Sequence, residues 1–381
     1  MAPYVLWGTP GSLYTGKLRS YLRKARIDYV ERAVGLPEFR AVVAPAVGRW
    51  IMPVLQLPDG SYLQDGAAII DHFEAVAPVL GETGVIGVIA ALFELYGGEG
   101  MVRAAMHYRW NFDDENLAFL AADFGGTLVS GDAAARAAIF ADSSGRMRTA
   151  TQIFGVNPST YAAVEAGYAR FLALLDAHLD AQPYLLGGRP TRGDFGLIGP
   201  LYAHLGRDPA PARRMKASAW RVWRWVERMN VRDDDAGEYG DFAPVLLADD
   251  SIPDTLTALL AFVAEDYLGE VAAMVGFTNR WLAEHPEATQ GSIINGRASK
   301  RIIGMTSFDW HGTPLTAGVM PYRLWLLQRV QDAADALAGD ARARLDALFA
   351  ATGLAPLLAL RTDRRVERGD NCEIWGKEAS R

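Results

Sequence analysis

The feature that most constrains the fold is the order of extended and helical segments in the first eighty residues. Tyr4–Trp7 is a short apolar run typical of a β-strand, and the turn-rich sequence Gly8-Thr9-Pro10-Gly11 ends it. Ser12 is a candidate N-cap for a helix to about Ala25, because apolar residues then recur at helical spacing and Lys and Arg gather in the second half. This part of the chain is therefore predicted as strand, loop and helix.

The next segments predict a strand, a hairpin and a second helix. Ile27–Val34 resumes an extended pattern, and Trp50–Gln56 and Ser61–Gln64 flank a Pro-Asp-Gly turn typical of a β-hairpin. Pro53 interrupts the first strand of this hairpin, and proline cannot donate to a sheet ladder. We therefore expect Pro53 at a strand start, with a cis Met52-Pro53 bond turning the chain. Gly66–Ala75 follows as a helix.

The remaining chain is predicted to be mainly helical. Alanine-rich helical patterns fill the chain from about Val79 to Asn230, and Thr191 with Asp194 forms a variant of the capping box at a helix start. After a charged break at 232–241, Asp254–Met274 and Tyr322–Leu348 are predicted helices. Between them, two extended runs around residues 309–313 suggest a short β-hairpin.

Composition excludes several classes of protein. A formal charge of −7 without a basic cluster argues against nucleic acid as a partner. The longest apolar run, Gly84–Leu95, is shorter than the about 20 residues of a membrane span and contains Glu94, so we expect a buried helix and no membrane partner. The single cysteine, Cys372, excludes a disulfide framework, and no residue cluster has the spacing of a metal site. The N-terminal sequence lacks a secretion signal, which predicts a cytoplasmic protein.

The order of elements, with the Met52-Pro53-Val54 sequence before the hairpin and a DG-x-x-L-x-acid pattern after it, resembles the N-terminal domain of the glutathione transferases. Ser12–Arg19 matches the family's S-x-x-x-x-[KR]-x-R segment. The resemblance implies a thioredoxin-like α/β domain at residues 1–78 and an all-helical domain at 79–231. Residues 232–381 are then a mostly helical C-terminal extension that such enzymes usually lack.

The resemblance also implies a glutathione site. A group at a helix N-terminus meets unsatisfied N–H donors and favours an anion, so a thiol docked at Ser12 would ionise more easily, with Tyr14 as the alternative donor. Asp65-Gly66 stands where the family keeps an acid-serine pair, and the missing serine hydroxyl weakens that match. The implied catalytic residues are Ser12 and Tyr14, the implied cofactor-binding residues are Met52, Pro53, Gln64, Asp65 and Gly66, and the implied substrate-pocket residues are Tyr108 and Arg109.

These expectations favour a glutathione S-transferase or glutathione-dependent lyase. Such an enzyme adds glutathione, as co-substrate, to a small aromatic or halogenated electrophile. A role in detoxification and a homodimer follow from the same resemblance. Trp310, His311 and Arg323 are candidates for a lid over the substrate pocket. The alternative is a non-catalytic binding or scaffold protein of the same fold, which Gly66 in place of the serine favours.

Overall fold

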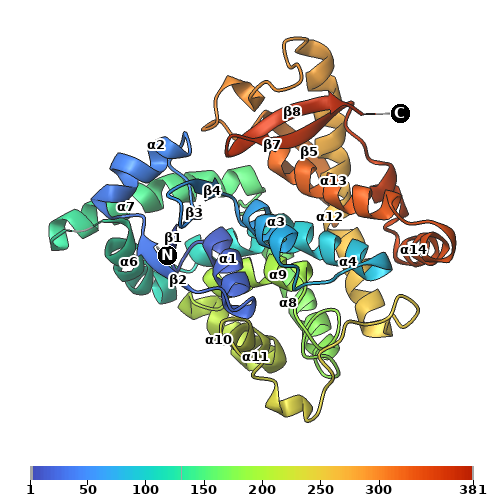
Figure 1. Cartoon of the computed structure of the whole chain (residues 1–381). Helices are drawn as coiled ribbons and strands as arrows, with labels where there is room; N and C mark the ends of the chain where they lie inside the picture. The colour runs from blue at the N-terminus through green and yellow to red at the C-terminus, as the bar shows by residue number, and fades with distance from the viewer. Residues whose placement is uncertain (1–2, 130, 380–381) are drawn as a thin grey trace.

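The computed structural model describes residues 3–129 and 131–379. Its N-terminal part is a four-stranded sheet with strand order β2-β1-β3-β4 (Figure 1). The strands are β1 (Tyr4–Gly8), β2 (Tyr29–Ala33), β3 (Val54–Gln56) and β4 (Tyr62–Gln64). β1 runs parallel to β2 and antiparallel to β3, with Leu6 opposite both Glu31 and Leu55. Because β1 is central, its side chains Leu6 and Trp7 are fully buried.

Two longer helices accompany this sheet, as predicted. They are α1 (Leu13–Lys24) and α3 (Gly66–Val76), and the short α2 (Ala44–Ala46) follows a π-helical turn at Phe39–Val43. The basic residues Arg23 and Lys24 lie in the last turn of α1, where the helix dipole favours positive charge. The strand, loop and helix order, the hairpin at the Asp-Gly turn and the α/β class of this part are confirmed.

A large helical region follows, which confirms the predicted all-helical part. Its capping box at Thr191 and Asp194 is present as expected. The helices are α4 (Gly84–Leu95), α5 (Val102–Trp110), α6 (Asp113–Leu128), α7 (Ala133–Ala150), α8 (Tyr161–His178), α9 (Arg192–Ala203), α10 (Pro209–Ser218) and α11 (Trp220–Met229), with a π-helical turn at Tyr96–Gly100 and a 3-10 turn at Thr151–Phe154.

The helix that contains the predicted apolar run Gly84–Leu95 is longer than that run. Through the π-helical turn, α4 continues into α5, so that Gly84–Trp110 forms 27 helical residues with a mean hydropathy of 1.5 in its most apolar window. Length and composition alone would allow this segment to cross a membrane, but 89% of that window is buried inside the protein. It is therefore a central core helix of this fold.

The C-terminal segment is mostly helical but contains two hairpins. Its helices are α12 (Asp254–Glu284), α13 (Pro321–Asp335) and α14 (Gly339–Thr352), and its strand pairs are β5 (Gly304–Trp310) with β6 (Thr313–Val319) and β7 (Arg364–Gly369) with β8 (Cys372–Glu378). Short 3-10 turns lie at Gly237–Tyr239, Ile294–Gly296 and Ala355–Ala359.

The first hairpin of this segment was predicted, and three other features differ from the sequence expectations. The β7–β8 hairpin was missed, because its strands carry many charged side chains in place of an apolar alternation. The single helix predicted over Tyr322–Leu348 is two helices, and Gly339, with a φ of 53°, begins the second one. α12 extends to Glu284, ten residues beyond the predicted end at Met274.

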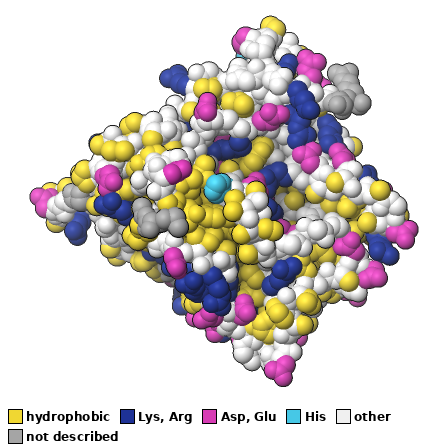
Figure 2. Space-filling model, in the orientation of Figure 1, with side chains coloured by type: hydrophobic (Ala, Val, Ile, Leu, Met, Phe, Trp, Pro, Cys, Tyr) yellow, Lys and Arg dark blue, Asp and Glu magenta, His cyan; other side chains and the backbone are white. Residues whose placement is uncertain are grey.

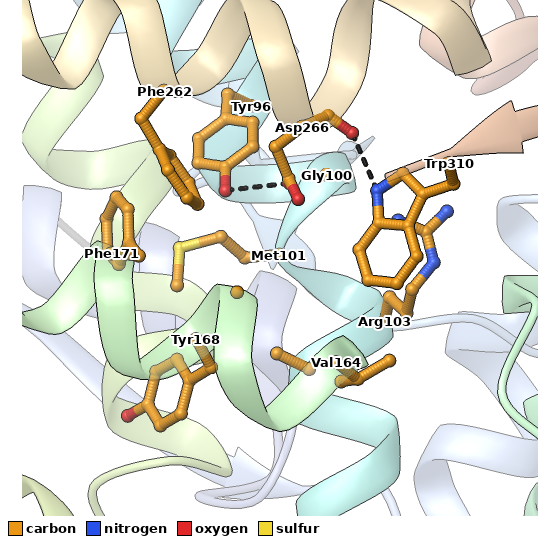
Figure 3. Close-up of a pocket in the computed structure, with 12 residues that line it drawn as sticks. Tyr96, Gly100, Met101, Arg103, Val164, Tyr168, Phe171, Phe262, Asp266 and Trp310 are labelled. Carbon is orange, nitrogen blue, oxygen red and sulfur yellow. Dashed lines mark hydrogen bonds between the residues drawn. The ribbon is translucent and has the colours of Figure 1, made fainter. Parts of the chain in front are cut away.

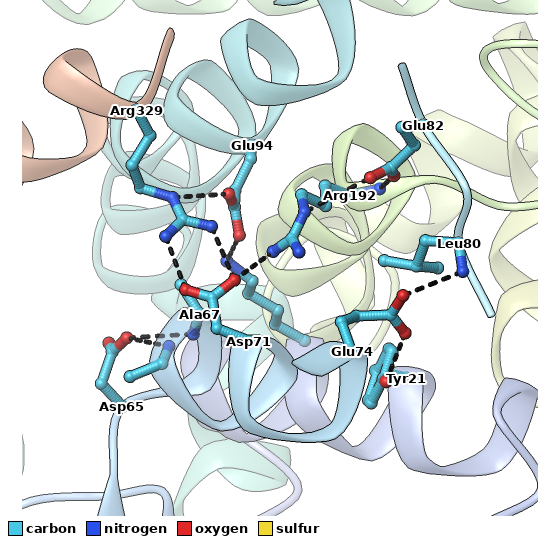
Figure 4. A network of polar contacts seen from close by, with 12 residues as sticks. Tyr21, Asp65, Ala67, Asp71, Glu74, Leu80, Glu82, Glu94, Arg192 and Arg329 are labelled. Carbon is cyan, nitrogen blue, oxygen red and sulfur yellow. Dashed lines mark hydrogen bonds and ion pairs between the residues drawn. The ribbon is translucent and has the colours of Figure 1, made fainter. Parts of the chain in front are cut away.

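The C-terminal segment shares its core with the rest of the chain. One apolar cluster of buried side chains contains Leu18 of α1, Phe93 of α4, Leu260 of α12 and Trp375 of β8. A buried polar network adds to it, in which Glu94 contacts Lys17 at 2.6 Å and Arg329 at 3.4 Å (Figure 4). These contacts join α1, α4 and α13, so the extension packs as an integral part of the molecule.

Candidate functional site

The N-terminus of α1 presents Ser12. This residue has extended dihedrals, and its Oγ accepts the N–H of Thr15 at 3.2 Å, which is the geometry of an N-cap. The hydroxyl proton of Ser12 has no acceptor among residues 3–129 and 131–379, and the side chain is partly exposed. Ser12 is thus placed to donate one hydrogen bond outward from the start of a helix.

Tyr14 is engaged elsewhere. Its hydroxyl donates to Glu99 Oε1 at 2.9 Å, and Arg323 Nε donates to the other oxygen of Glu99 at 3.0 Å. Burial, followed by the nearby Glu99 carboxylate, raises the pKa of Tyr14 well above its usual value. Because its proton is held by Glu99, Tyr14 is a poorer candidate than Ser12 for donating to a ligand.

The Met52-Pro53 peptide lies beside the same loop. This bond is cis, as the sequence predicted. Thr9, three residues before Ser12, directs its hydroxyl to the sulfur of Met52 at 3.6 Å. The backbone N–H and C=O of Met52 make no hydrogen bond within the part of the chain that the structure describes, so both can pair with an extended ligand.

Asp65 and Gly66 begin α3 next to the first turn of α1. The Asp65 carboxylate caps α3, accepting the N–H groups of Ala67 at 2.9 Å and Ala68 at 3.0 Å. Gly66 lies next to the first turn of α1, since a Cβ added there would be in ordinary van der Waals contact, 3.5 Å, with the carbonyl oxygen of Tyr14. The structure therefore brings the starts of α1 and α3 together, as the predicted cofactor site requires.

The C-terminal hairpin binds Gln64 directly. The backbone N–H of Gln64 donates to Asn371 Oδ1 at 2.9 Å, and its carbonyl oxygen accepts from Arg368 Nη2 at 3.0 Å. Arg368 and Arg49 both donate to the side-chain oxygen of Gln64, and both pair with Glu373. The backbone N–H, the backbone carbonyl and the side-chain oxygen of Gln64 are therefore all engaged by this hairpin or by Arg49.

Sequence reasoning missed these partners. Arg368 and Asn371 stand 304 and 307 positions from Gln64 along the chain, and no motif links them. The one available signal was that Asp370-Asn371 interrupts a charged extended run, as a hairpin turn does. Both residues have positive φ, 45° for Asp370 and 62° for Asn371, as is usual for such turns.

The predicted substrate-pocket residues occupy different surroundings. Arg109 is buried in an ion pair with Asp208, with Nε to Oδ2 at 2.7 Å, and it also donates to the carbonyl of Gly11 at 2.9 Å. It therefore holds the loop before Ser12 against the helical region. Tyr108 packs flat on Phe112, with ring centroids 5.0 Å apart, and lines a surface hollow with Arg214. Neither position supports the predicted contact with a substrate at Ser12.

The three candidate lid residues are anchored. Trp310 Nε1 donates to the carbonyl of Asp266 at 2.9 Å, and His311 Nε2 lies 3.1 Å from the Asp266 carboxylate. Arg323 is buried between Glu99 and Glu270. These contacts argue against a movable lid, because each would have to be broken for it to open.

A separate cavity lies between α5, α8 and α12 (Figure 3). Its wall is largely aromatic, and Tyr96 donates to Asp266 across it at 3.0 Å. The cavity volume of about 20 Å³ accommodates about one water molecule. Trp310 of the predicted lid lines it, but none of the predicted catalytic, cofactor-binding or substrate-pocket residues does, and its size argues against a second substrate site.

Comparison with known proteins agrees with the geometry at the N-terminal domain. Residues 6–83 match the family model described as glutathione S-transferase, N-terminal domain. No curated protein matches the chain significantly.

Solved structures of the same family also align with this chain. A glutathione S-transferase of Methylobacterium radiotolerans, in complex with glutathione sulfonate, is 18% identical, with 66% of this chain and 100% of that chain covered and a TM-score of 0.36. A glutathione transferase of Phanerochaete chrysosporium is 18% identical, with 61% and 98% covered and a TM-score of 0.42. One of Ceriporiopsis subvermispora, in complex with glutathione, is 17% identical, with 64% and 100% covered and a TM-score of 0.39.

The residues matched by the family model therefore include the candidate site at the start of α1. Ser12, the cis Met52-Pro53 bond and Asp65 all lie within the matched residues 6–83. The C-terminal residues that contact Gln64 lie outside that range. Residues 6–83 are therefore similar to the N-terminal domain of the glutathione S-transferases.

Proposed function

We propose that this protein binds glutathione at the N-terminus of α1 and uses Ser12 to stabilise the thiolate for attack on a small electrophile. The observation that carries the proposal is the hydroxyl of Ser12, which caps α1 and keeps its proton available. The matched family domain over residues 6–83 supports it. Thiolate formation is favoured near a helix N-terminus and by hydrogen-bond donors.

The surroundings fit the thiol and cysteinyl part of glutathione. The backbone groups of Met52 are open to an extended peptide, and the N–H of Gly66 lies at the start of α3, where an anion is favoured. The surroundings of Gln64 fit less well, because its backbone groups are already bound by Asn371 and Arg368. The γ-glutamyl end would therefore rely on groups other than those of Gln64.

In this proposal glutathione supplies the nucleophilic sulfur, and the protein supplies position and charge. Ser12 donates its hydroxyl proton as a hydrogen bond to the thiolate and forms no covalent bond. A transferase reaction then joins the sulfur to the electrophilic carbon, and the electron pair of the broken bond leaves with the leaving group. Conjugation and lyase chemistry share this first step, and the fold alone does not choose between them.

A non-catalytic binding protein is the second candidate. The observation in its favour is the C-terminal hairpin at Gln64, where Asn371 and Arg368 occupy backbone groups beside the start of α3. If the γ-glutamyl end finds no partner, the same fold would act through its surfaces. Calorimetry with glutathione separates the two candidates. A protein that acts only through its surfaces should bind no glutathione at millimolar concentration.

The decisive experiment compares Ser12→Ala with Tyr14→Phe. For the wild type with saturating glutathione, we expect ultraviolet thiolate absorbance at neutral pH. Ser12→Ala should reduce that absorbance and raise the pKa of the bound thiol, because the donor hydrogen bond is lost.

Tyr14→Phe is the matched control. The hydroxyl that it removes donates to Glu99, so the absorbance should be retained. Loss of the absorbance in Tyr14→Phe, with retention in Ser12→Ala, would refute the role of Ser12. Thermal unfolding of both variants checks that the fold is intact, since removing the N-cap at Ser12 costs about 1 kcal/mol.

A further inference from the structure

The C-terminal segment places a cation beside α1 that forms no ion pair with a carboxylate in the described part of the chain. The guanidinium of Arg301 lies 6.0 Å from the centre of the Tyr14 ring. Arg301 is only partly exposed, and it makes no hydrogen bond or ion pair with residues 3–129 and 131–379. The other arginines nearby, Arg49, Arg323 and Arg368, are all paired with carboxylates.

The acidic groups around Arg301 are committed to other partners. One carboxylate oxygen of Glu373 accepts a hydrogen bond from Arg49, and the other accepts one from Arg368. Glu99 gives its two oxygens to Tyr14 and Arg323. Withdrawing a cation from water is costly unless an anion compensates it. Against the effect of burial, both carboxylates act on Arg301 through space and raise its pKa, but among the described residues neither forms an ion pair with it.

A small enclosed space adjoins this cation. Lys300, Arg301, Tyr322 and Glu373 contribute to its wall, and its volume is about 10 Å³. This is room for one water-sized group, such as a carboxylate oxygen, so the remainder of a ligand would lie outside it. Figure 2 shows a hollow between the N-terminal domain and the C-terminal segment, with Lys or Arg side chains on its wall.

The position of Arg301 relates this space to the thiol site. Tyr14, whose ring faces Arg301, lies in the first turn of α1, two residues after Ser12. Lys300 is exposed next to Arg301, and its side chain makes no hydrogen bond or ion pair within the described part of the chain. Arg301 of the extension thus lies beside the first turn of α1, and Lys300 lines the same small space as Arg301. The planar guanidinium suits a carboxylate in particular, since it can donate two parallel hydrogen bonds.

We propose that Arg301, assisted by Lys300, binds the carboxylate of a small molecule at the Ser12 site. This inference rests on the proposed function, because it makes the extension part of the same binding site. The carboxylate belongs either to glutathione itself or to the electrophilic second substrate. Both sources share one chemistry, and binding experiments distinguish them.

The experiment uses the full-length protein and the Arg301→Gln variant. Three probes are titrated by calorimetry: glutathione, 3,5-dinitrobenzoate and the uncharged 3,5-dinitrobenzamide. Neither nitroaromatic probe carries a leaving group at the usual position of attack, so binding is measured without turnover. We expect Arg301→Gln to weaken one carboxylate probe by about tenfold or more, as is typical for a lost charge-assisted hydrogen bond, and to leave the amide unchanged.

Arg297→Gln is the matched control. Arg297 is an exposed arginine on the same segment and makes no ion pair among the described residues, so its loss should change no affinity. Arg301→Lys keeps the charge and loses the planar fork, and it should retain part of the affinity. Thermal unfolding establishes that each variant is folded.

Each outcome has a defined meaning. Weaker glutathione binding in Arg301→Gln assigns the carboxylate to glutathione, and weaker 3,5-dinitrobenzoate binding assigns it to the second substrate. The inference is overturned if the wild type binds 3,5-dinitrobenzoate and 3,5-dinitrobenzamide with equal affinity and Arg301→Gln leaves glutathione binding unchanged. If the wild type binds 3,5-dinitrobenzoate through Arg301 but does not bind glutathione, the proposed function fails while the carboxylate site stands.

Discussion

The buried contact between Lys17 of α1 and Glu94 of α4 provides the sharpest test of how the N-terminal domain is held against the helical region. Lys17 Nζ lies 2.6 Å from Glu94 Oε1, and the two side chains are 6% and 1% exposed. Burial would raise the pKa of Glu94, but Lys17, Arg329 and Arg192 lower it to about 2 (Figure 4). The carboxylate is therefore ionised and depends on its cations.

Removing one partner should lower the free energy of unfolding far more than removing both. Lys17→Met leaves the ionised Glu94 with Arg329, which is 3.4 Å away and is itself shared with Asp71. Breaking a buried pair in this way costs about 3–5 kcal/mol, and the remaining arginine places the expected loss near the lower figure. In the double variant Lys17→Met/Glu94→Leu no unpaired carboxylate remains, so much of the loss should be recovered.

Urea unfolding of the wild type, both single variants and the double variant gives the coupling free energy. The exposed pair of Arg213 and Glu115 supplies a control, because Glu115→Gln should cause no measurable change in the unfolding midpoint. Additive losses in the double variant would refute the reasoning, since they would mean that Lys17 and Glu94 do not compensate each other.

Three further predictions concern other parts of the chain. Asp194→Ala should lower the free energy of unfolding by about 3 kcal/mol or more in urea, because the buried N–H groups of Leu185, Thr191 and Trp225 lose their acceptor; a loss below about 1 kcal/mol would contradict this. The hydrogen bond with Asp266 raises the pKa of His311 above 6.5, so His311 contributes stability below pH 6.5 that is lost as pH rises through the folded-state pKa. NMR titration should show a lower His311 pKa in Asp266→Asn, and an unchanged value would argue against the pairing. Asn371→Ala removes the acceptor of the Gln64 N–H, so hydrogen exchange at Gln64 should accelerate while exchange at Leu6 in the central strand stays slow; equal exchange at Gln64 in both proteins would show that the hairpin does not protect it.

The local features of the N-terminal domain could be predicted because short-range physics determines them. An N-cap serine, an Asp-Gly hairpin turn and a proline at a strand start each act within a few residues, and the structure confirms all three at Ser12, Gly60 and Pro53. The capping box of Thr191 and Asp194 was predictable for the same reason.

The tertiary structure decided how these residues are used. Sequence left Ser12 and Tyr14 as alternative donors, and only the position of Glu99, 85 residues away from Tyr14, shows that the tyrosine proton is engaged. Likewise, the sequence shows an Arg at position 301 and an Asn at 371 without placing either beside the N-terminal domain. Such contacts depend on how distant segments pack over a common core, and residue spacing carries no information about that packing.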